Sequence, residues 1–474
     1  MSFQRQFGTW PTAIDSLTLL CRFLPATDSR PLAGTVTSDI GNAATRNWLM
    51  SRRWFLVAPT LLFLWIIAQI DKTNVSLFIA DAKFLKELNL VGHNAELGGL
   101  MSTFFLGYGI SIFAWGFLVD RFGPRRCAMA GILGWGCALF LSSKAHGIQE
   151  LLWIRFVLGV AEGNLWPVSN ALTNRWFPVR EHSRVQAFWI TGSTLGTAIG
   201  VPVVTALILS GGWRGTLVAL SLVSLLPAVL FYFVADWPRK SKGIREQELH
   251  DIETGRKRPD RVEPLSFGEL LKSAPFWLVT LAHFISATTI YTLVQWIPSY
   301  LTTFRHVPFK DMGRWITIGY VLATVLTLLV GYLADRTMQR ALTGAWVCLA
   351  FVLLILPAQM LSTTGSALLL STLIFVASST AALNGALMHT MVRPEAIARG
   401  TGVYAGIGML SSAIGPWLFG TLVTTLAGQY WGGFAFLAAL NIVGSIAYLT
   451  LYRLSSEVRR TQEARTVKVH PAVG

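Results

Sequence analysis

The chain has 474 residues, of which 53% are hydrophobic and 13% charged, and its formal net charge is +15. Soluble domains carry about 25% charged residues, and here the hydrophobic residues stand in long runs. This composition excludes a soluble globular enzyme, a disordered chain and a coiled coil. The four cysteines show no metal-ligand spacing, and no nucleophile–base pair or cofactor motif is present. We therefore expect no metal, no cofactor and no enzymatic activity.

Twelve apolar segments are long enough to cross a bilayer, which requires about 20 residues per helix. The sequence thus predicts an all-α membrane protein with twelve transmembrane helices in two six-helix bundles. In chain order the predicted spans are 54–79, 97–119, 127–143, 150–171, 185–209, 213–235, 276–301, 314–334, 341–361, 366–389, 400–425 and 431–452.

Polar segments divide the chain into five parts. Residues 50–235 form the first predicted bundle and 275–453 the second, with a linker over 236–274 between them and a tail over 454–474. Residues 1–49 contain no spanning segment and no signal-peptide pattern. We expect a disordered cytoplasmic extension there, or a start codon placed too early, in preference to a functional domain.

The basic residues are distributed unevenly between the two sides of these spans. If both termini are cytoplasmic, the cytoplasmic segments carry 30 Lys and Arg residues and the outer loops carry 7. Cytoplasmic loops of membrane proteins are enriched in Lys and Arg, which face anionic lipid headgroups. The positive charge therefore predicts orientation and a lipid partner, and we expect no nucleic-acid binding.

One loop motif recurs at matching places in the two halves. The first copy follows the second span, and its residues are Gly116, Asp120, Arg121, Gly123, Arg125 and Arg126. The second copy follows the eighth span and retains Asp335 and Arg336. The arginines alone would be explained by the general enrichment of basic residues in cytoplasmic loops. The repeated spacing, however, indicates duplicated six-helix units, as in many transporters.

Four charged residues lie well inside the predicted spans: Asp71, Lys72, Arg155 and Glu162. Each costs about 2.5–3.5 kcal/mol on insertion scales, so such residues usually mark substrate or proton pathways. At 1.5 Å per residue, Asp71 lies roughly 12 Å from the outer surface, and Arg155 and Glu162 lie roughly 8 and 18 Å from it. Since these depths agree, we expect one cluster in a water-reachable chamber between the bundles.

This predicted quartet has zero net charge, so one added proton would let it accept a monoanion at net zero. We expect Lys72 and Arg155 to bind a substrate carboxylate, because guanidinium suits a bidentate contact. Asp71 and Glu162 would carry the coupling proton. The alternative is a purely structural salt-bridge network, and Arg155 could instead extend to the nearby outer surface.

Two neutral polar residues could also line the chamber. Tyr108 in the second span could stack on or hydrogen-bond the substrate, or could simply pack in the core. Asn384 is polar within the apolar tenth span and could reach the chamber.

The loop Gly116–Arg126 resembles the signature loop of the major facilitator superfamily, which implies that Asp120 and Arg121 belong to a cytoplasmic gate. Asp335 and Arg336 would be a second, incomplete copy. The segments Asp71–Asn74 and Arg155–Pro167 resemble the anion:cation symporter family, which includes proton symporters for galactonate, glucarate and aromatic acids. This resemblance implies the same roles for the quartet, and it makes Gln295 of the seventh span a hydrogen-bonding partner of the substrate.

The sequence departs from the sugar-acid carriers at two places. Lys72 stands where they usually have Arg, and Tyr404-Ala405 stands where an aromatic residue followed by Asn is expected. The first departure removes one bidentate contact, and the second weakens the case for a polyhydroxylated substrate.

These observations predict a monomeric secondary transporter in a bacterial inner membrane that takes up a small organic carboxylate with protons by alternating access. An anion exchanger or efflux carrier is the alternative within transport. A transporter-like sensor that binds the same anion is an alternative of another class.

Overall fold

A computed structural model describes residues 51–255, 271–337, 339–391 and 394–469. Residues 1–49 and parts of the predicted linker and tail lie outside these ranges. Every regular element in the described residues is a helix. In chain order the elements are η1 Arg53–Val57, α3 Ala58–Phe78, α4 Ala82–Glu87, α5 Asn94–Phe122, α6 Pro124–Ser142, α7 Ile148–Glu162, α8 Leu165–Trp176, η2 Val179–Glu181, α9 His182–Val223, α10 Leu226–Phe233, η3 Pro238–Lys240, α11 Glu246–Gly255, α13 Ala274–Ser299, η4 Tyr300–Phe304, α14 Phe309–Thr337, α15 Arg340–Ile355, η5 Pro357–Met360, α16 Thr363–Thr372, α17 Ile374–Met391, α18 Pro394–Thr425 and α19 Trp431–Val469.

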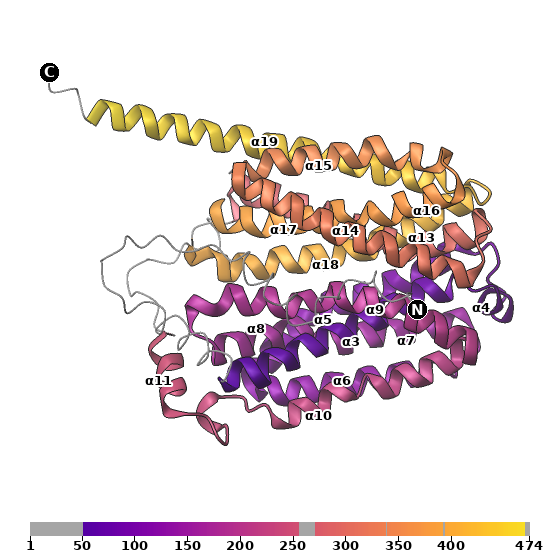
Figure 1. The fold of residues 1–474 in the computed structure, drawn as a ribbon, viewed down its shortest axis with the longest axis horizontal. Coiled ribbons are helices and arrows are strands. Elements are labelled where there is room, and N and C mark those ends of the chain that lie inside the picture. Colours follow the sequence, from indigo (N-terminus) through magenta and orange to yellow (C-terminus); the bar gives the residue numbers. More distant parts are fainter. Residues whose placement is uncertain (1–50, 256–270, 338, 392–393, 470–474) are drawn as a thin grey trace, which may run out of the picture. The chain divides into compact units, whose positions relative to one another are not determined.

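The helices follow the order of the predicted spans. Nine segments of the described residues are long and apolar enough to cross a membrane. One of them, 184–233, contains two predicted spans, because Gly212 breaks α9 with φ 66° and ψ 178°. The two remaining predicted spans are α6 and the α7–α8 pair, which is divided by a turn at Gly163 and Asn164. Figure 1 shows the long helices side by side, with α11 at one end of them, here called the linker end, and α4 at the other, here called the far end.

Close helix packing defines two halves and the contact between them. In the first half α3 packs along α9 and α5 along α7, and in the second half α13 packs along α17 and α18. The main contact between the halves is α5 against α18, with smaller contacts of α9 with α14 and α3 with α13. Glycines permit this approach: a Cβ on Gly98 would lie 2.3 Å from the carbonyl oxygen of Pro416, and one on Gly420 would lie 2.2 Å from that of Asn94.

The contact between α5 and α7 is equally tight and places the charged residues of α7 beside the aromatic residues of α5. A Cβ on Gly159 would lie 2.0 Å from the carbonyl oxygen of Phe104, and one on Gly107 would lie 2.2 Å from that of Phe156. Since even one methyl group does not fit, the backbones touch directly, as small residues allow in membrane helices. This contact holds the face of α7 that bears Glu162 against the aromatic residues of α5.

At the linker end, the carboxylate of Glu248 in α11 binds the start of the first span. Its two oxygens accept hydrogen bonds from the backbone N–H groups of Arg52 and Arg53, each at 3.0 Å. The Arg53 side chain in turn pairs with Asp251 at 2.8 Å and with Glu181 at 3.0 Å. The first turn of a helix has unsatisfied backbone donors, so Glu248 supplies the acceptor that they require and fixes α11 to the first half.

At the far end, Glu87 ties α4 to the start of the sixth span. It accepts hydrogen bonds from Trp213 Nε1 at 2.7 Å and from Arg214 Nε at 2.9 Å. The hydrogen bond from Trp213 lowers the pKa of Glu87 from its ordinary 4.5, while burial opposes the shift and Arg214 adds to it.

Candidate functional site

The four charged residues of the predicted quartet lie together in the first half, and all are buried. Asp71 and Lys72 come from α3, and Arg155 and Glu162 from α7; their exposed fractions are 2%, 7%, 4% and 1%. Charges buried this deeply are tolerated only when other charges or hydrogen bonds compensate them.

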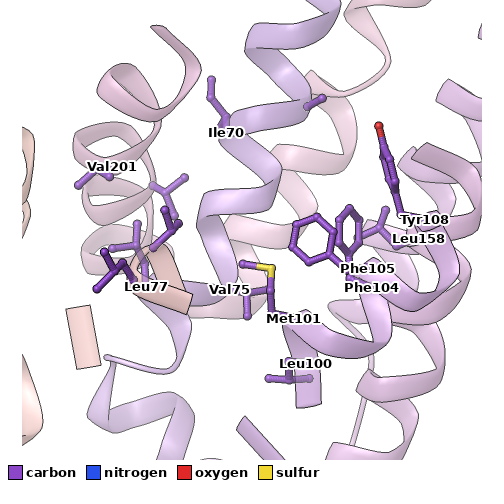
Figure 2. Close-up of a cluster of buried hydrophobic side chains, with 14 of the residues drawn as sticks. Ile70, Val75, Leu77, Leu100, Met101, Phe104, Phe105, Tyr108, Leu158 and Val201 are labelled. Carbon is purple, nitrogen blue, oxygen red and sulfur yellow. The ribbon is translucent and has the colours of Figure 1, made fainter. Parts of the chain in front are cut away.

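Lys72 is held by an anion and by two aromatic rings. Its Nζ forms a salt bridge with Glu162 Oε2 and lies 3.5 Å from the carbonyl oxygen of Ala68. The same ammonium lies 5.4 Å from the ring centroids of both Phe104 and Tyr108, within cation–π range. Figure 2 shows these two rings grouped on α5. Tyr108 is therefore part of the wall around Lys72.

Asp71 accepts hydrogen bonds from two neutral donors. Asn74 Nδ2 donates to its Oδ1 at 2.5 Å, and Trp135 Nε1 of α6 donates to its Oδ2 at 2.9 Å. Arg155 Nη2 donates to the other end of the same amide, Asn74 Oδ1, at 2.6 Å. Arg155 is thus linked to Asp71 through Asn74.

The two carboxylates are also close to each other. Glu162 interacts with Asp71 as well as with Lys72. Its second oxygen, Oε1, is buried and has no hydrogen-bond partner among the described residues. An unpaired buried carboxylate oxygen is costly, and a proton shared between the two groups would remove that cost.

The structure corrects the expectation of an open chamber around the quartet. The cavity beside Arg155 has a volume of about 10 Å³ and is lined mainly by apolar side chains of the first half, including Val75, Leu100 and Trp213. This volume holds about one water molecule. The four side chains are at most 7% exposed, so they are shielded from solvent in this structure. The second half approaches them through Tyr291 of α13, whose ring lies 4.2 Å from that of Phe105.

The two other predicted substrate contacts lie elsewhere. Gln295 of α13 donates to the carbonyl oxygen of Leu97 in α5 at 3.2 Å, so its amide bridges the two halves at the far end. Asn384 of α17 donates to Ser286 Oγ at 3.3 Å and accepts a hydrogen bond from Tyr448 of α19 at 2.6 Å. Asn384 thus belongs to a polar network inside the second half, and neither residue joins the quartet.

The predicted gating loop lies at the linker end. Gly123 has φ +89°, and a Cβ there would lie 2.7 Å from the carboxylate of Asp236. The same carboxylate accepts a hydrogen bond from the backbone N–H of Arg125 at 2.8 Å, at the start of α6. The other residues of the loop have open surroundings, since Gly116 would accept a Cβ freely and Asp120, Arg121 and Arg126 are exposed.

In the second copy of this motif Arg336 is exposed, and the side chain of Asp335 lies outside the described part of the chain. Sequence reasoning singled out none of three residues that complete these sites: Asn74, Trp135 and Asp236. Asn74 carried a signal, because it stands three residues after Asp71 on the same helical face. No comparable signal marked the other two.

Comparisons with known proteins agree with the fold and with the class of protein. The profile of the Major Facilitator Superfamily matches residues 61–416. The chain is 29% identical over 288 residues to a protein of Cupriavidus necator named as a probable sulfoacetate transporter, a match that covers 60% of this chain and 66% of the relative. It is 24% identical over 421 residues to the D-galactonate transporter of Escherichia coli O6:H1, covering 84% of this chain and 96% of the relative.

A solved structure gives the same result for the fold. The bacterial homologue of the human lysosomal transporter Spinster, in an inward-facing and unoccupied conformation, superposes with a TM-score of 0.68 at 15% identity, covering 85% of this chain and 97% of that chain. The predicted resemblance and the predicted all-α membrane fold are both confirmed. Because the family profile matches most of its length, the chain belongs to the Major Facilitator Superfamily of membrane transporters.

Proposed function

We propose that this protein is a symporter that carries a small organic carboxylate together with protons by alternating access. The observation that supports this proposal most directly is the buried salt bridge between Lys72 and Glu162. Glu162 occupies the place beside Lys72 that a substrate anion would take.

The charge balance of the quartet couples the binding of a proton to the binding of the substrate anion. Two cations and two carboxylates sum to zero, and a protonated Glu162 would leave Lys72 without its counter-ion. Removing one partner of a buried ion pair costs about 3–5 kcal/mol, and a substrate carboxylate at Lys72 would recover part of that cost. Proton binding therefore favours anion binding, and by linkage the anion favours the proton.

Arg155 is the second proposed anion contact. Its guanidinium donates to a neutral amide and to no carboxylate within salt-bridge distance among the described residues. It therefore retains a full charge for a bidentate contact with a carboxylate. The names of two relatives, transporters for D-galactonate and sulfoacetate, support an organic anion as the substrate class.

We assign the linker end to the cytoplasm, since the Lys and Arg residues are concentrated in segments on that side. Both termini would then be cytoplasmic, in a bacterial inner membrane, and the inwardly directed proton gradient would drive uptake. Because the quartet is shielded from solvent here, opening of the helices around α3 and α7 must precede binding.

Transport into liposomes that contain the purified protein tests this proposal. D-galactonate, glucarate, 4-hydroxyphenylacetate and sulfoacetate are supplied outside, with the external medium more acidic than the lumen. We expect at least one of them to accumulate and to alkalinise the external medium, and Lys72→Met to abolish both signals. Anion exchange without proton movement would establish the exchanger alternative, and no response to any of these anions would refute the proposal.

A further inference from the structure

We propose that the amide of Asn74 is a positioning element that transmits the protonation state of Asp71 to Arg155. This inference rests on the proposed function, because it assumes that Asp71 takes up a proton and that Arg155 binds the substrate anion. It explains how Arg155, the second cation of the quartet, is freed from its hydrogen bond to Asn74. This step is separate from the direct salt bridge between Lys72 and Glu162.

The hydrogen bonds around Asp71 determine which of its oxygens can take a proton. Trp135 donates to Oδ2, and an indole N–H is a donor only. In a protonated carboxyl group the carbonyl oxygen is the better acceptor, so the bond from Trp135 favours keeping Oδ2 unprotonated. A proton on Asp71 is best placed on Oδ1, the oxygen that faces Asn74.

The amide of Asn74 then has to turn. In the present arrangement its Nδ2 donates to Asp71 and its Oδ1 accepts from Arg155. A proton on Oδ1 of Asp71 would place two donors face to face. Turning the amide restores that bond with its direction reversed, but it presents Nδ2 to Arg155, which has donors only. The hydrogen bond to Arg155 is lost, and the guanidinium becomes available to a carboxylate.

Other ionisable groups face this network from the neighbouring helices. Glu162 of α7 interacts directly with Asp71, and Lys72 lies next to it on α3. Tyr108 of α5 lies beside Lys72, and Tyr291 of α13 is close enough to interact with Glu162. Since Glu162 could also respond to pH, the experiment has to isolate the part of the response that passes through Asn74.

A double-mutant cycle isolates that part. Binding of D-galactonate, glucarate, 4-hydroxyphenylacetate and sulfoacetate to the purified protein is measured at alkaline pH, with and without Asp71→Asn as a mimic of the protonated carboxyl. If Asn74 transmits the change, Asp71→Asn tightens anion binding about tenfold in the wild-type background, a typical coupling between linked sites. In the Asn74→Leu background the same substitution should change binding by less than about threefold, since contacting residues are non-additive.

If Asp71→Asn has the same effect on anion binding in both backgrounds, the inference is refuted and the proposed function is left intact. The two substitutions would then act additively, as expected if Asn74 has a purely structural role or if Asp71 acts on Arg155 through space. If the wild-type protein binds none of the four anions, both the proposed function and this inference are refuted. Asn74→Ala replaces Asn74→Leu in the same cycle if the latter does not fold. Asn441→Leu is the matched control, since this buried amide donates to Thr289 and to a backbone carbonyl in the second half; it should leave the effect of Asp71→Asn unchanged.

Discussion

Replacement of Glu162 by Gln removes one carboxylate from the quartet and keeps the shape of the side chain. Lys72, which is 7% exposed, then loses its one ion-pair partner among the described residues, and it keeps the two rings 5.4 Å away and the carbonyl of Ala68. Loss of a buried partner costs about 3–5 kcal/mol. The cation–π contacts are the same before and after the substitution, so they do not change this difference. If a bound carboxylate recovers about 1.4 kcal/mol of the cost, anion affinity at alkaline pH rises about tenfold.

Proton-driven accumulation should change in the opposite direction. Each coupled proton is worth about 1.36 kcal/mol per pH unit, which is a tenfold concentration ratio. We therefore expect Glu162→Gln to lower the steady-state accumulation of the anion about tenfold in liposomes under a gradient of about one pH unit. Counterflow exchange, which needs no net proton movement, should persist.

Glu150→Gln is the matched control for this experiment. Glu150 lies on the same helix, is exposed, and accepts a hydrogen bond from the backbone N–H of His146. This variant should accumulate the anion like the wild type. Accumulation by Glu162→Gln that equals the wild-type ratio, with unchanged anion affinity, would contradict the assignment of Glu162 as a coupling group.

Three further predictions concern stability. Gly159→Ala should abolish the monodisperse folded protein in size-exclusion chromatography, because its Cβ would lie 2.0 Å from a carbonyl oxygen of α5, whereas Gly211→Ala, with nothing within 4 Å, should behave like the wild type. Glu248→Ala leaves two backbone donors at the start of the first span without their acceptor. It should therefore lower the free energy of unfolding by about 1–3 kcal/mol, which is measured as a lower Tm. An unchanged Tm would show that water replaces the carboxylate. The pKa of Glu87 is lowered by Trp213, so its contacts stabilise the fold above the ordinary value of 4.5 and this contribution is lost as the pH falls below it. Glu87→Gln should therefore lower Tm slightly at neutral pH and match the wild type in acid, and a difference that persists in acid would argue against this origin.

The quartet was predictable because charge is expensive in an apolar helix. Asp71, Lys72, Arg155 and Glu162 stand out from their sequence surroundings, and their depths in two spans can be calculated from the rise per residue. That calculation requires no knowledge of neighbouring helices. The repeated loop was recognisable for a similar reason, since its spacing is local in the sequence.

The partners of the quartet were not predictable in this way. Trp135 contacts Asp71 because of the rotation of α6 about its axis, which is set by packing against several helices. Most Trp residues in membrane proteins anchor to the interface, so its type gave no signal. Asn384 was expected to face a chamber, but its partner Tyr448 lies 64 residues away. Gln295 was expected to hydrogen-bond the substrate, but in this structure it donates to the carbonyl of Leu97, which belongs to the other half of the molecule.

Every formal charge of the quartet belongs to the first half of the chain, and the side chain with which the second half approaches it, Tyr291, is neutral at ordinary pH. Proton coupling and recognition of the substrate carboxylate, both of which we assign to these four residues, would then reside in the same half of the polypeptide. Chimeras that retain residues 51–255 and exchange the later helices with those of a relative would then keep both the driving ion and the requirement for a carboxylate group, so the later helices could diverge without loss of energy coupling.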